Sequence, residues 1–207
     1  MTSLIDVAAW RSSQRRELLN QRTALDKETL SRWQFAMDQR LERGFPFTIT
    51  PGAVIAICWP HRNEYDLRAL AARWRSAGAT IALPVVMEKA APLVFRAWDT
   101  DTVMAAGPQG IPHPEDGPAL IPNVVLAPAV GYDLQGYRLG YGGGYFDRTL
   151  AALADKGQRP LTIATAYEMC KLDSVYPQPH DVPMDYVLNE AGLYRRDQDR
   201  LVPIDPD

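Results

Sequence analysis

The sequence predicts an α/β fold in which a mainly parallel sheet is covered by helices on both faces. Short apolar runs rich in β-branched residues are typical of strands buried on both faces, and they recur at 53–59, 80–86, 123–130 and 161–167. Segments with apolar residues at helical spacing alternate with these runs. Such alternation is typical of parallel strands joined by crossover helices, here preceded by a helical N-terminus.

The first half of the chain is expected to begin with two helices within residues 1–44. Asp26 is a suitable N-cap for the second helix, and Gly44 ends its apolar pattern, which comprises Leu30, Trp33, Met37 and Leu41. The elements expected next are a strand at 53–59, a helix at 64–78, and strands at 80–86 and 93–99.

The second half begins with a connection rich in proline and glycine at 107–122, of which 112–122 is expected to be a loop. The elements expected after it are a strand at 123–130, a glycine-rich loop, a helix from about Tyr145 to Gly157, and strands at 161–167 and within 185–195.

Length and composition predict one domain spanning residues 1–207. The chain is 46% hydrophobic and 23% charged, which suffices for one sizeable core. A net charge of −3 argues against nucleic acid or a membrane surface as a partner. Two cysteines cannot form a disulfide framework, and no run approaches the roughly 20 apolar residues that span a bilayer. We therefore expect a soluble, cytoplasmic protein and, as its oligomeric state, a monomer.

The segment RLGYGGGYFDR at 138–148 is the most unusual stretch of the sequence. Glycine in a regular element costs about 0.5–1 kcal/mol relative to alanine, so a tight turn or the approach of backbone amides to a ligand should compensate. The segment lies between an expected strand and helix, where the helix N-terminus suits a phosphate. Neither the dinucleotide fingerprint nor the Walker A pattern matches. Arg138 and Asp147, a potential Mg²⁺ ligand, favour a nucleotide site, although Asp147 also suits the first turn of a helix.

The first helix carries Arg11 and Arg15 one turn apart, in the same sector as Leu18, Arg22 and Leu25. A solvated face would tolerate the small repulsion between the two arginines. The leucines in this sector indicate instead that the face packs against the protein, and an anion between the guanidinium groups would then be favourable.

These segments together resemble the 5-formyltetrahydrofolate cyclo-ligase family. The resemblance covers the whole chain and rests mainly on RLGYGGGYFDR, with support from the Arg11/Arg15 pair and four shorter segments, namely 59–64, 83–86, 107–114 and HDVPMDYVLNE at 180–190. It implies a three-layer α/β/α sandwich related to the sugar-phosphate isomerase and CoA-transferase group. It also implies a reduced folate substrate, ATP as co-substrate and Mg²⁺.

Carried onto this sequence, the resemblance assigns Arg138 and Tyr145 as catalytic residues, with Tyr145 a stacking wall or a proton donor. It assigns Asp147 and Asp181 to Mg²⁺. The ATP-binding residues it implies are Arg11, Arg15, Arg138, Gly140, Gly142, Gly143, Gly144, Tyr145 and Phe146. The folate-binding residues it implies are Trp59, Glu64, Tyr141, Gly142, Gly143, Gly144 and Tyr145.

Several positions depart from the family pattern. Many members have arginine where Tyr141 stands and lysine where Gly143 stands, glutamine where Cys170 stands and aspartate where Asn123 stands. A non-catalytic or altered-substrate paralogue that binds folate or nucleotide is therefore the alternative to a cyclo-ligase. The three histidines lie on separate expected loops without zinc-helix spacing, and His180 is expected to orient the Asp181 segment.

Overall fold

The computed structural model describes residues 6–45 and 50–204. Residues 1–5 of the expected helical segment lie outside the described part. Eight strands form one sheet in the order β13-β12-β11-β9-β6-β1-β2-β3. The central strands, β11, β9, β6, β1 and β2, are parallel to one another, whereas β3, β12 and β13 pair antiparallel at the two edges. The prediction of an α/β fold with a mainly parallel sheet is confirmed.

Seven of the eight strands begin within predicted segments, whereas β13, which follows the segment 185–195, was not predicted. In chain order the eight strands are β1 Val54–Ala56, β2 Thr80–Val85, β3 Val94–Ala97, β6 Val124–Pro128, β9 Leu161–Thr165, β11 Tyr186–Leu188, β12 Leu193–Asp197 and β13 Arg200–Pro203. Each central strand is hydrogen-bonded to a neighbour on both sides, and helices or loops cover both of its faces. This burial explains why the central strands are nearly all apolar.

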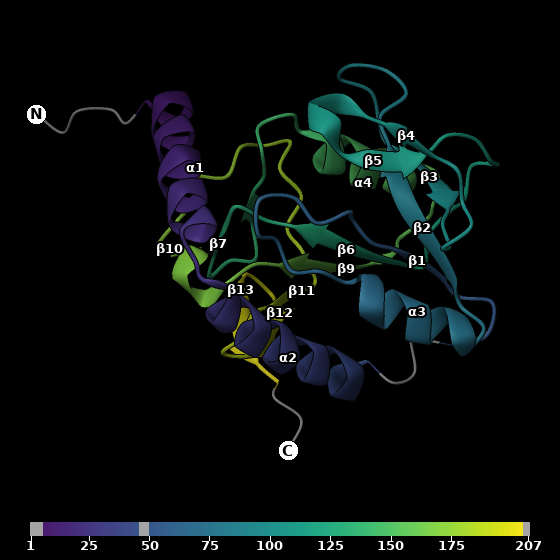
Figure 1. Cartoon of the computed structure of the whole chain (residues 1–207). Coiled ribbons are helices and arrows are strands. Elements are labelled where there is room, and N and C mark those ends of the chain that lie inside the picture. The colour runs from purple at the N-terminus through teal and green to yellow at the C-terminus, as the bar shows by residue number, and fades with distance from the viewer. Residues whose placement is uncertain (1–5, 46–49, 205–207) are drawn as a thin grey trace, which may run out of the picture.

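The helices are α1 Val7–Thr23, α2 Lys27–Gly44, α3 Arg68–Ser76 and α4 Tyr145–Asp155. Asp26 caps α2 as predicted, since its Oδ1 accepts a hydrogen bond from the Thr29 amide at 2.8 Å. In the view of Figure 1, α2 and α3 lie below the central strands and α4 lies above them. Three layers, and a relation to the isomerase and transferase group, stay predictions. No helix of the described chain is long and apolar enough to span a membrane.

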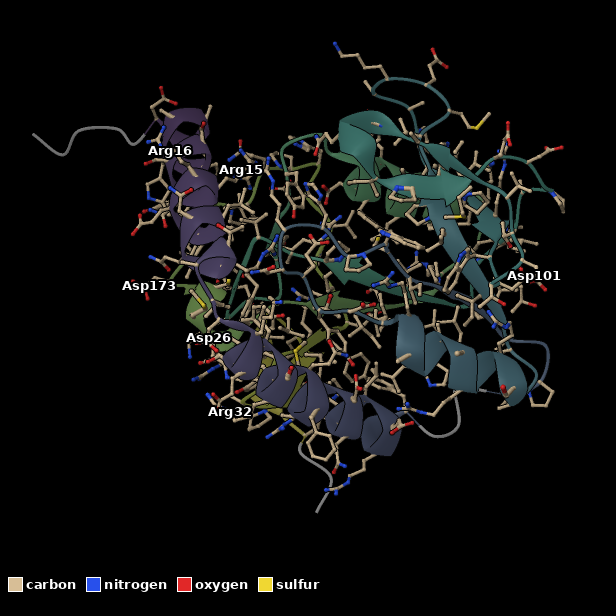
Figure 2. All side chains as sticks on the ribbon, in the orientation of Figure 1. Arg15, Arg16, Asp26, Arg32, Asp101 and Asp173 are labelled. Atoms are coloured by element: carbon tan, nitrogen blue, oxygen red, sulfur yellow. The ribbon has the colours of Figure 1, made fainter. Side chains whose placement is uncertain are left out.

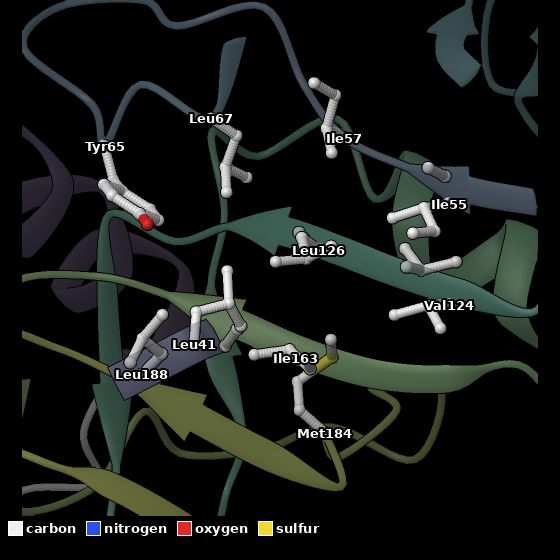
Figure 3. Packing of buried hydrophobic residues seen from close by; sticks show 14 of the residues in the cluster. Leu41, Ile55, Ile57, Tyr65, Leu67, Val124, Leu126, Ile163, Met184 and Leu188 are labelled. Atoms are coloured by element: carbon white, nitrogen blue, oxygen red, sulfur yellow. The ribbon is translucent and has the colours of Figure 1, made fainter. Parts of the chain in front are cut away.

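The core lies between α2 and the sheet. Leu41 of α2 is 2% exposed and packs in the same cluster as Ile55, Leu126 and Ile163 of the central strands (Figure 3). Burying each such side chain stabilises the fold by about 1.5–3 kcal/mol. This cluster fixes the central strands and therefore the loops that leave their carboxyl ends.

Two predicted boundaries are wrong for local reasons. The helix predicted at 64–78 begins only at Arg68, because the Asp66 amide is held by the side chain of Gln34 and the Asp66 carboxylate accepts the Arg68 amide at 3.0 Å. The loop predicted at 112–122 contains a strand, β5 Pro112–Pro114, which pairs antiparallel with β4 Met104–Ala106. A short 3₁₀ turn, η1 Pro108–Gly110, joins these two strands.

A second small sheet was not predicted from the sequence. Its strands are β7 Gly131–Asp133, β8 Arg138–Leu139 and β10 Lys171–Leu172, and the 3₁₀ turn η2 Glu168–Cys170 precedes β10. The glycine-rich loop therefore begins directly from a strand. Leu18 of α1 packs close to Gly131 of this sheet, where an added Cβ would lie 2.9 Å from the leucine side chain.

Candidate active site

The candidate site lies where the order of the sheet reverses. After β1, the next two strands, β2 and β3, are added on one side of β1. The strand β6 then lies on the other side of β1, and the later strands β9, β11, β12 and β13 continue from it. Ligands of open α/β sheets bind beyond the carboxyl ends of the strands at such a point. A cavity of about 220 Å³ lies there. Its lining includes Trp59 and Glu64 after β1, Pro128 at the end of β6, and much of the glycine-rich loop.

The loop between β8 and α4 has an unusual backbone at two glycines. Gly142 has φ +96° and Gly144, the N-cap of α4, has φ +62°, a left-handed region that other residues rarely adopt. Position 143 requires glycine for a steric reason, because a Cβ there would lie 2.7 Å from the ring of Tyr145. The loop thus brings its backbone to the N-terminus of α4, whose first amides have no acceptor within the helix.

Arg138 and Asp147 form a largely buried ion pair at this end of the cavity. The Nη1 of Arg138 donates to Oδ1 of Asp147 at 2.8 Å, and the side chains are 4% and 15% exposed. The Val182 amide donates to the same oxygen at 3.1 Å. The guanidinium also lies over the ring of Phe146, 5.5 Å from its centroid. A cation is therefore fixed within the cavity wall, beside the helix N-terminus.

The arginine face of α1 packs against the protein, as the leucines in its sector predict. Arg11 forms an ion pair with Asp181 and donates to the Val175 carbonyl at 2.9 Å. Arg15 donates to the carbonyl of Gly140 at 2.7 Å. Figure 2 shows Arg15 on the side of α1 that faces the rest of the chain. Burial, and the neighbouring charge of Arg11, lower the pKa of Arg15.

A buried carboxylate also lines the cavity. Glu64 is 6% exposed, and its Oε1 accepts a hydrogen bond from the Tyr141 hydroxyl at 2.6 Å. Its Oε2 accepts the His61 amide at 3.0 Å. Burial raises the pKa of Glu64, an effect that the nearby Arg22 and Tyr141 oppose. Trp59 lies on the same wall and stacks beneath Arg68, whose guanidinium is 4.7 Å from the indole centroid.

Comparison with known proteins identifies the family to which this fold and these motifs belong. The family model of the 5-formyltetrahydrofolate cyclo-ligase family matches residues 7–190. This chain belongs to that family.

Two relatives and two solved structures illustrate its place among the cyclo-ligases. The 5-formyltetrahydrofolate cyclo-ligase of Mycolicibacterium smegmatis is 36% identical over 66% of this chain and 73% of the relative. The Haemophilus influenzae protein of that name is 28% identical over 65% and 74%. The Mycoplasma pneumoniae 5,10-methenyltetrahydrofolate synthetase superposes with a TM-score of 0.67 at 26% identity, over 87% of this chain and 98% of that one. The Aquifex aeolicus synthetase gives 0.74 at 24% identity, over 94% and 96%.

Most of the residues predicted for the site of this cyclo-ligase line one cavity. They are Trp59, Glu64, Arg138, Gly140, Tyr141, Gly143, Gly144, Tyr145, Phe146 and Asp147. Arg11, Arg15, Gly142 and Asp181 lie outside its lining but connect to it. Arg15 is bonded to the loop at Gly140, and the segment of Asp181 is bonded to Asp147 through the Val182 amide.

The two predicted metal ligands do not form a preformed metal cage. Each carboxylate is paired with an arginine, Asp147 with Arg138 and Asp181 with Arg11. In the described residues, no three or more His, Cys, Asp and Glu side chains are grouped for metal binding. Mg²⁺ characteristically uses one or two carboxylates and completes its octahedron with water and substrate phosphates. The donor set therefore fits a magnesium ion that arrives with a nucleotide.

Sequence reasoning missed one entire wall of the cavity. The segment 107–113, which runs from the end of β4 through η1 into β5, contributes most of its residues to the lining. Although 107–114 supports the family resemblance, neither its prolines and glycines nor the isolated His113 indicates a role in a site, so the three-dimensional arrangement reveals this wall. Cys58 and His61 also line the cavity, and burial raises the pKa of the Cys58 thiol well above its ordinary value. The sequence had given both of these residues no role.

Two of the departures from the family pattern lie away from the cavity. Asn123 is at the amino end of β6, where its Oδ1 accepts the Val54 amide at 2.8 Å, so its role is to hold β1 beside β6. Cys170 is fully buried in the core, outside the cavity lining. His180 is exposed and its Nε2 lies 3.8 Å from Oδ1 of Asp181, so the expected orienting role stays a prediction.

Proposed function

We propose that this chain catalyses the ATP- and Mg²⁺-dependent cyclisation of 5-formyltetrahydrofolate to 5,10-methenyltetrahydrofolate, with release of ADP and phosphate. The observation that carries the proposal is that one cavity is lined both by a buried cation with a glycine-rich helix N-terminus and by a buried carboxylate with an indole. The first pair suits a polyphosphate and the second suits the polar edge and flat rings of a pterin.

The chemistry follows from the poor reactivity of the N5-formyl group. That group is an amide, so its carbonyl carbon is a weak electrophile. The formyl oxygen attacks the γ-phosphorus of ATP, the bond to the β-phosphate oxygen breaks, and ADP leaves. N10 then attacks the formyl carbon of the resulting imidate phosphate, inorganic phosphate leaves, and the 5,10-methenyl bridge closes. Such phosphoryl transfer needs positioning and charge stabilisation more than covalent help from the protein.

The phosphates of ATP are assigned to the glycine-rich loop and the arginines around it. Gly140 and Gly142–Gly144 offer backbone amides, and Arg138 offers a cation held in place by Asp147. Arg15 reaches the loop through its bond to Gly140, and Arg11 neighbours it one turn earlier on α1. Tyr145 and Phe146, which follow the loop, line the cavity and exclude water from the activated intermediate.

The reduced folate is assigned to the wall formed by Trp59, Glu64 and Tyr141. The carboxylate of Glu64 accepts hydrogen bonds from the pterin, and Trp59 supplies an apolar surface for its rings. Tyr145 is placed between the two substrates and serves as a stacking wall. Mg²⁺ supplies charge neutralisation of the phosphates, and Asp147 and Asp181 are the carboxylates that would hold it.

Three coarser predictions accompany this function. We propose that residues 1–207 form one domain with three layers, that the protein acts in the cytoplasm, and that it is a monomer without a nucleic-acid or membrane partner. Mass measurement in solution during chromatography tests the last of these, and a dimer would contradict it.

The function is tested by mixing purified protein with Mg-ATP and 5-formyltetrahydrofolate and following the near-ultraviolet absorbance of the methenyl product. We expect the band to grow only when ATP and Mg²⁺ are both present. A flat trace with folded protein that binds nucleotide in calorimetry would favour the altered-substrate paralogue.

The site assignment is tested by Asp147→Asn and Arg138→Ala. Both variants should lose turnover by at least about a hundredfold while circular dichroism shows a folded chain, because each removes a group that positions or neutralises phosphate. Asp155→Asn at the exposed end of α4 and Arg159→Ala beyond it are matched controls that should keep wild-type rates. Wild-type rates in Asp147→Asn or Arg138→Ala would refute the assignment.

A further inference from the structure

The last turn of α1 contains a buried arginine that the proposed chemistry does not use. Arg22 is 2% exposed, although arginine is almost never fully buried without partners. Its Nε donates to the Arg62 carbonyl at 2.9 Å, and its Nη1 donates to the Ala129 carbonyl at 3.2 Å. Its Nη2 donates to the Tyr141 hydroxyl at 2.5 Å and lies 3.4 Å from Oε1 of Glu64. One guanidinium thus joins the loop after β1, the end of β6 and the glycine-rich loop.

The loop after β1 needs this support because of its backbone. Arg62 and Asn63 have φ values of +50° and +57°, a conformation that residues with a Cβ adopt rarely. Besides the bond from Arg22 to the Arg62 carbonyl, Asn63 Nδ2 donates back to the Arg22 carbonyl at 3.3 Å. Glu64 follows directly. Strained turns persist where surrounding contacts over-determine them, and here those contacts come from the end of α1.

The carboxylate of Glu64 depends on the same guanidinium for its charge. A buried carboxylate without a nearby cation takes up a proton rather than remain charged. The described groups that affect it or touch it are Arg22 of α1, Tyr141 of the glycine-rich loop, the His61 amide, Cys58 after β1 and Tyr167 after β9. Among these, Arg22 is the cation that forms an ion pair with Glu64.

We propose that Arg22 is the positioning residue of the folate subsite, holding Glu64 charged and Tyr141 oriented on the cavity wall while not contacting substrate itself. This inference rests on the proposed function. The inference also gives Tyr141 a second role. Its hydroxyl accepts a hydrogen bond from the Arg22 guanidinium and donates one to Glu64, so Tyr141 links Arg22 to the glycine-rich loop. The end of α1 therefore sets folate affinity, whereas the middle of α1, through Arg15, contacts the glycine-rich loop.

The test compares Arg22→Gln and Arg22→Lys with the matched control Arg16→Gln, which makes the same change at an exposed position of the same helix (Figure 2). In Arg22→Gln the KM for 5-formyltetrahydrofolate should rise by about tenfold or more, because a hydrogen-bonded buried charge loses its partner. The KM for ATP should change less than about twofold. Arg16→Gln should leave both values as in the wild type.

The pH profile separates positioning from a merely structural role. Protonation removes the negative charge of Glu64 and turns one of its acceptor oxygens into a donor, so kcat/KM for the folate falls on the acid side as Glu64 gains its proton. Loss of the guanidinium raises the pKa of Glu64, so in Arg22→Gln this acid limb should move to higher pH by about one unit or more. Arg22→Lys keeps a cation but not the fork of donors, so its limb should stay near the wild-type position while its KM remains elevated.

Two results would overturn the inference. One is an unchanged folate KM and acid limb in a folded Arg22→Gln variant. The other is an equal loss of affinity for folate and ATP together with lowered thermal stability, which would make Arg22 only structural. If Arg22→Gln does not fold, Tyr141→Phe breaks the same relay, and it should raise the folate KM and move the limb in the same direction; an unchanged profile would refute the relay. Failure of the proposed function is distinct, since it would appear as absence of wild-type turnover.

Discussion

Individual residues of the glycine-rich loop serve different physical needs. Gly142 and Gly144 are required by their left-handed backbone, and Gly143 by the ring of Tyr145 beside it. Gly140 is different: its φ lies outside the left-handed region, and an added Cβ would meet no atom within 4 Å. Because Gly140 lines the cavity, the space that its missing side chain leaves is available to a ligand.

Gly140→Ala therefore separates ligand binding from folding. The variant should unfold within about 0.5 kcal/mol of the wild type in urea, since nothing in the protein clashes with the new methyl group. Its KM for ATP should rise about tenfold, because the methyl group keeps phosphate from the loop amides. Gly142→Ala is the comparison variant, and it should lose about 1–2 kcal/mol of stability through its left-handed backbone. A wild-type KM for ATP in Gly140→Ala would contradict the assignment of phosphate to this loop.

At this scale the sequence predicts residue types but not their burial. Arg138, Glu64 and Asp147 were assigned through RLGYGGGYFDR and the segment around Trp59, and all three line the cavity. Arg22 appeared only as one member of a helical stripe. Its importance depends on the carbonyls of Arg62 and Ala129, which come from distant parts of the chain and leave no local signal.

Among the elements, the arm formed by β4, η1 and β5 closes one side of the cavity. Pairing of β4 with β5 is reinforced by His113, whose Nδ1 lies 3.1 Å from the Ala105 carbonyl. The arm presents apolar side chains such as Ile111 to the cavity. In the proposed mechanism, water that reached the imidate phosphate would return it to 5-formyltetrahydrofolate and phosphate, so we propose that this wall protects the activated intermediate.

Ile111→Ala is predicted to uncouple ATP use from product formation. The smaller side chain admits water, so the amount of methenyl product per ADP released should fall clearly below the value of the wild type. Val103→Ala is the matched control, because Val103 precedes the same arm and is 68% exposed. Parallel measurement of ADP and of product absorbance gives the ratio. An unchanged ratio in Ile111→Ala would show that the arm does not exclude water.

The elements that the sequence did not predict share one property. Strands β4, β5, β7, β8 and β10 contain two or three residues each, and β13 contains four, too few for periodicity to appear. The central strands were predicted because five or six consecutive apolar residues identify a strand buried on both faces, as at β2 and β6. The start of α3 was misplaced because the amide of Asp66 donates to the side chain of Gln34, which is distant in sequence.

For the whole molecule, the three-stranded sheet of β7, β8 and β10 connects α1 to the large sheet. It is joined to the large sheet by a partly buried network in which Tyr132 of β7 donates to Oε2 of Glu168 at 2.7 Å, and Asn189 after β11 donates to the same oxygen at 2.7 Å. Burial raises the pKa of Glu168, but Lys171 and these hydrogen bonds outweigh it, so the pKa lies below its ordinary value. The ionised form of Glu168 therefore stabilises the fold.

This network gives a stability prediction with a defined pH dependence. A depressed pKa means that the stabilisation is complete above the ordinary glutamate value of about 4.3 and is lost as the pH falls through the lower folded value. Glu168→Gln should therefore be about 1–2 kcal/mol less stable than the wild type at neutral pH, with a smaller difference near pH 3. Urea unfolding at both pH values measures this, with exposed Glu115→Gln as control. An equal difference at both values would refute the role of the charge.

We propose above all that the site uses ATP to activate the formyl oxygen of the folate. This proposal is tested most directly with 5-formyltetrahydrofolate carrying ¹⁸O in the formyl group, by mass measurement of the phosphate that the wild-type protein releases. We expect phosphate that contains one ¹⁸O per methenyl product, because the formyl oxygen leaves bonded to phosphorus. Methenyl product accompanied by unlabelled phosphate would contradict it, since the oxygen would then have left by another route.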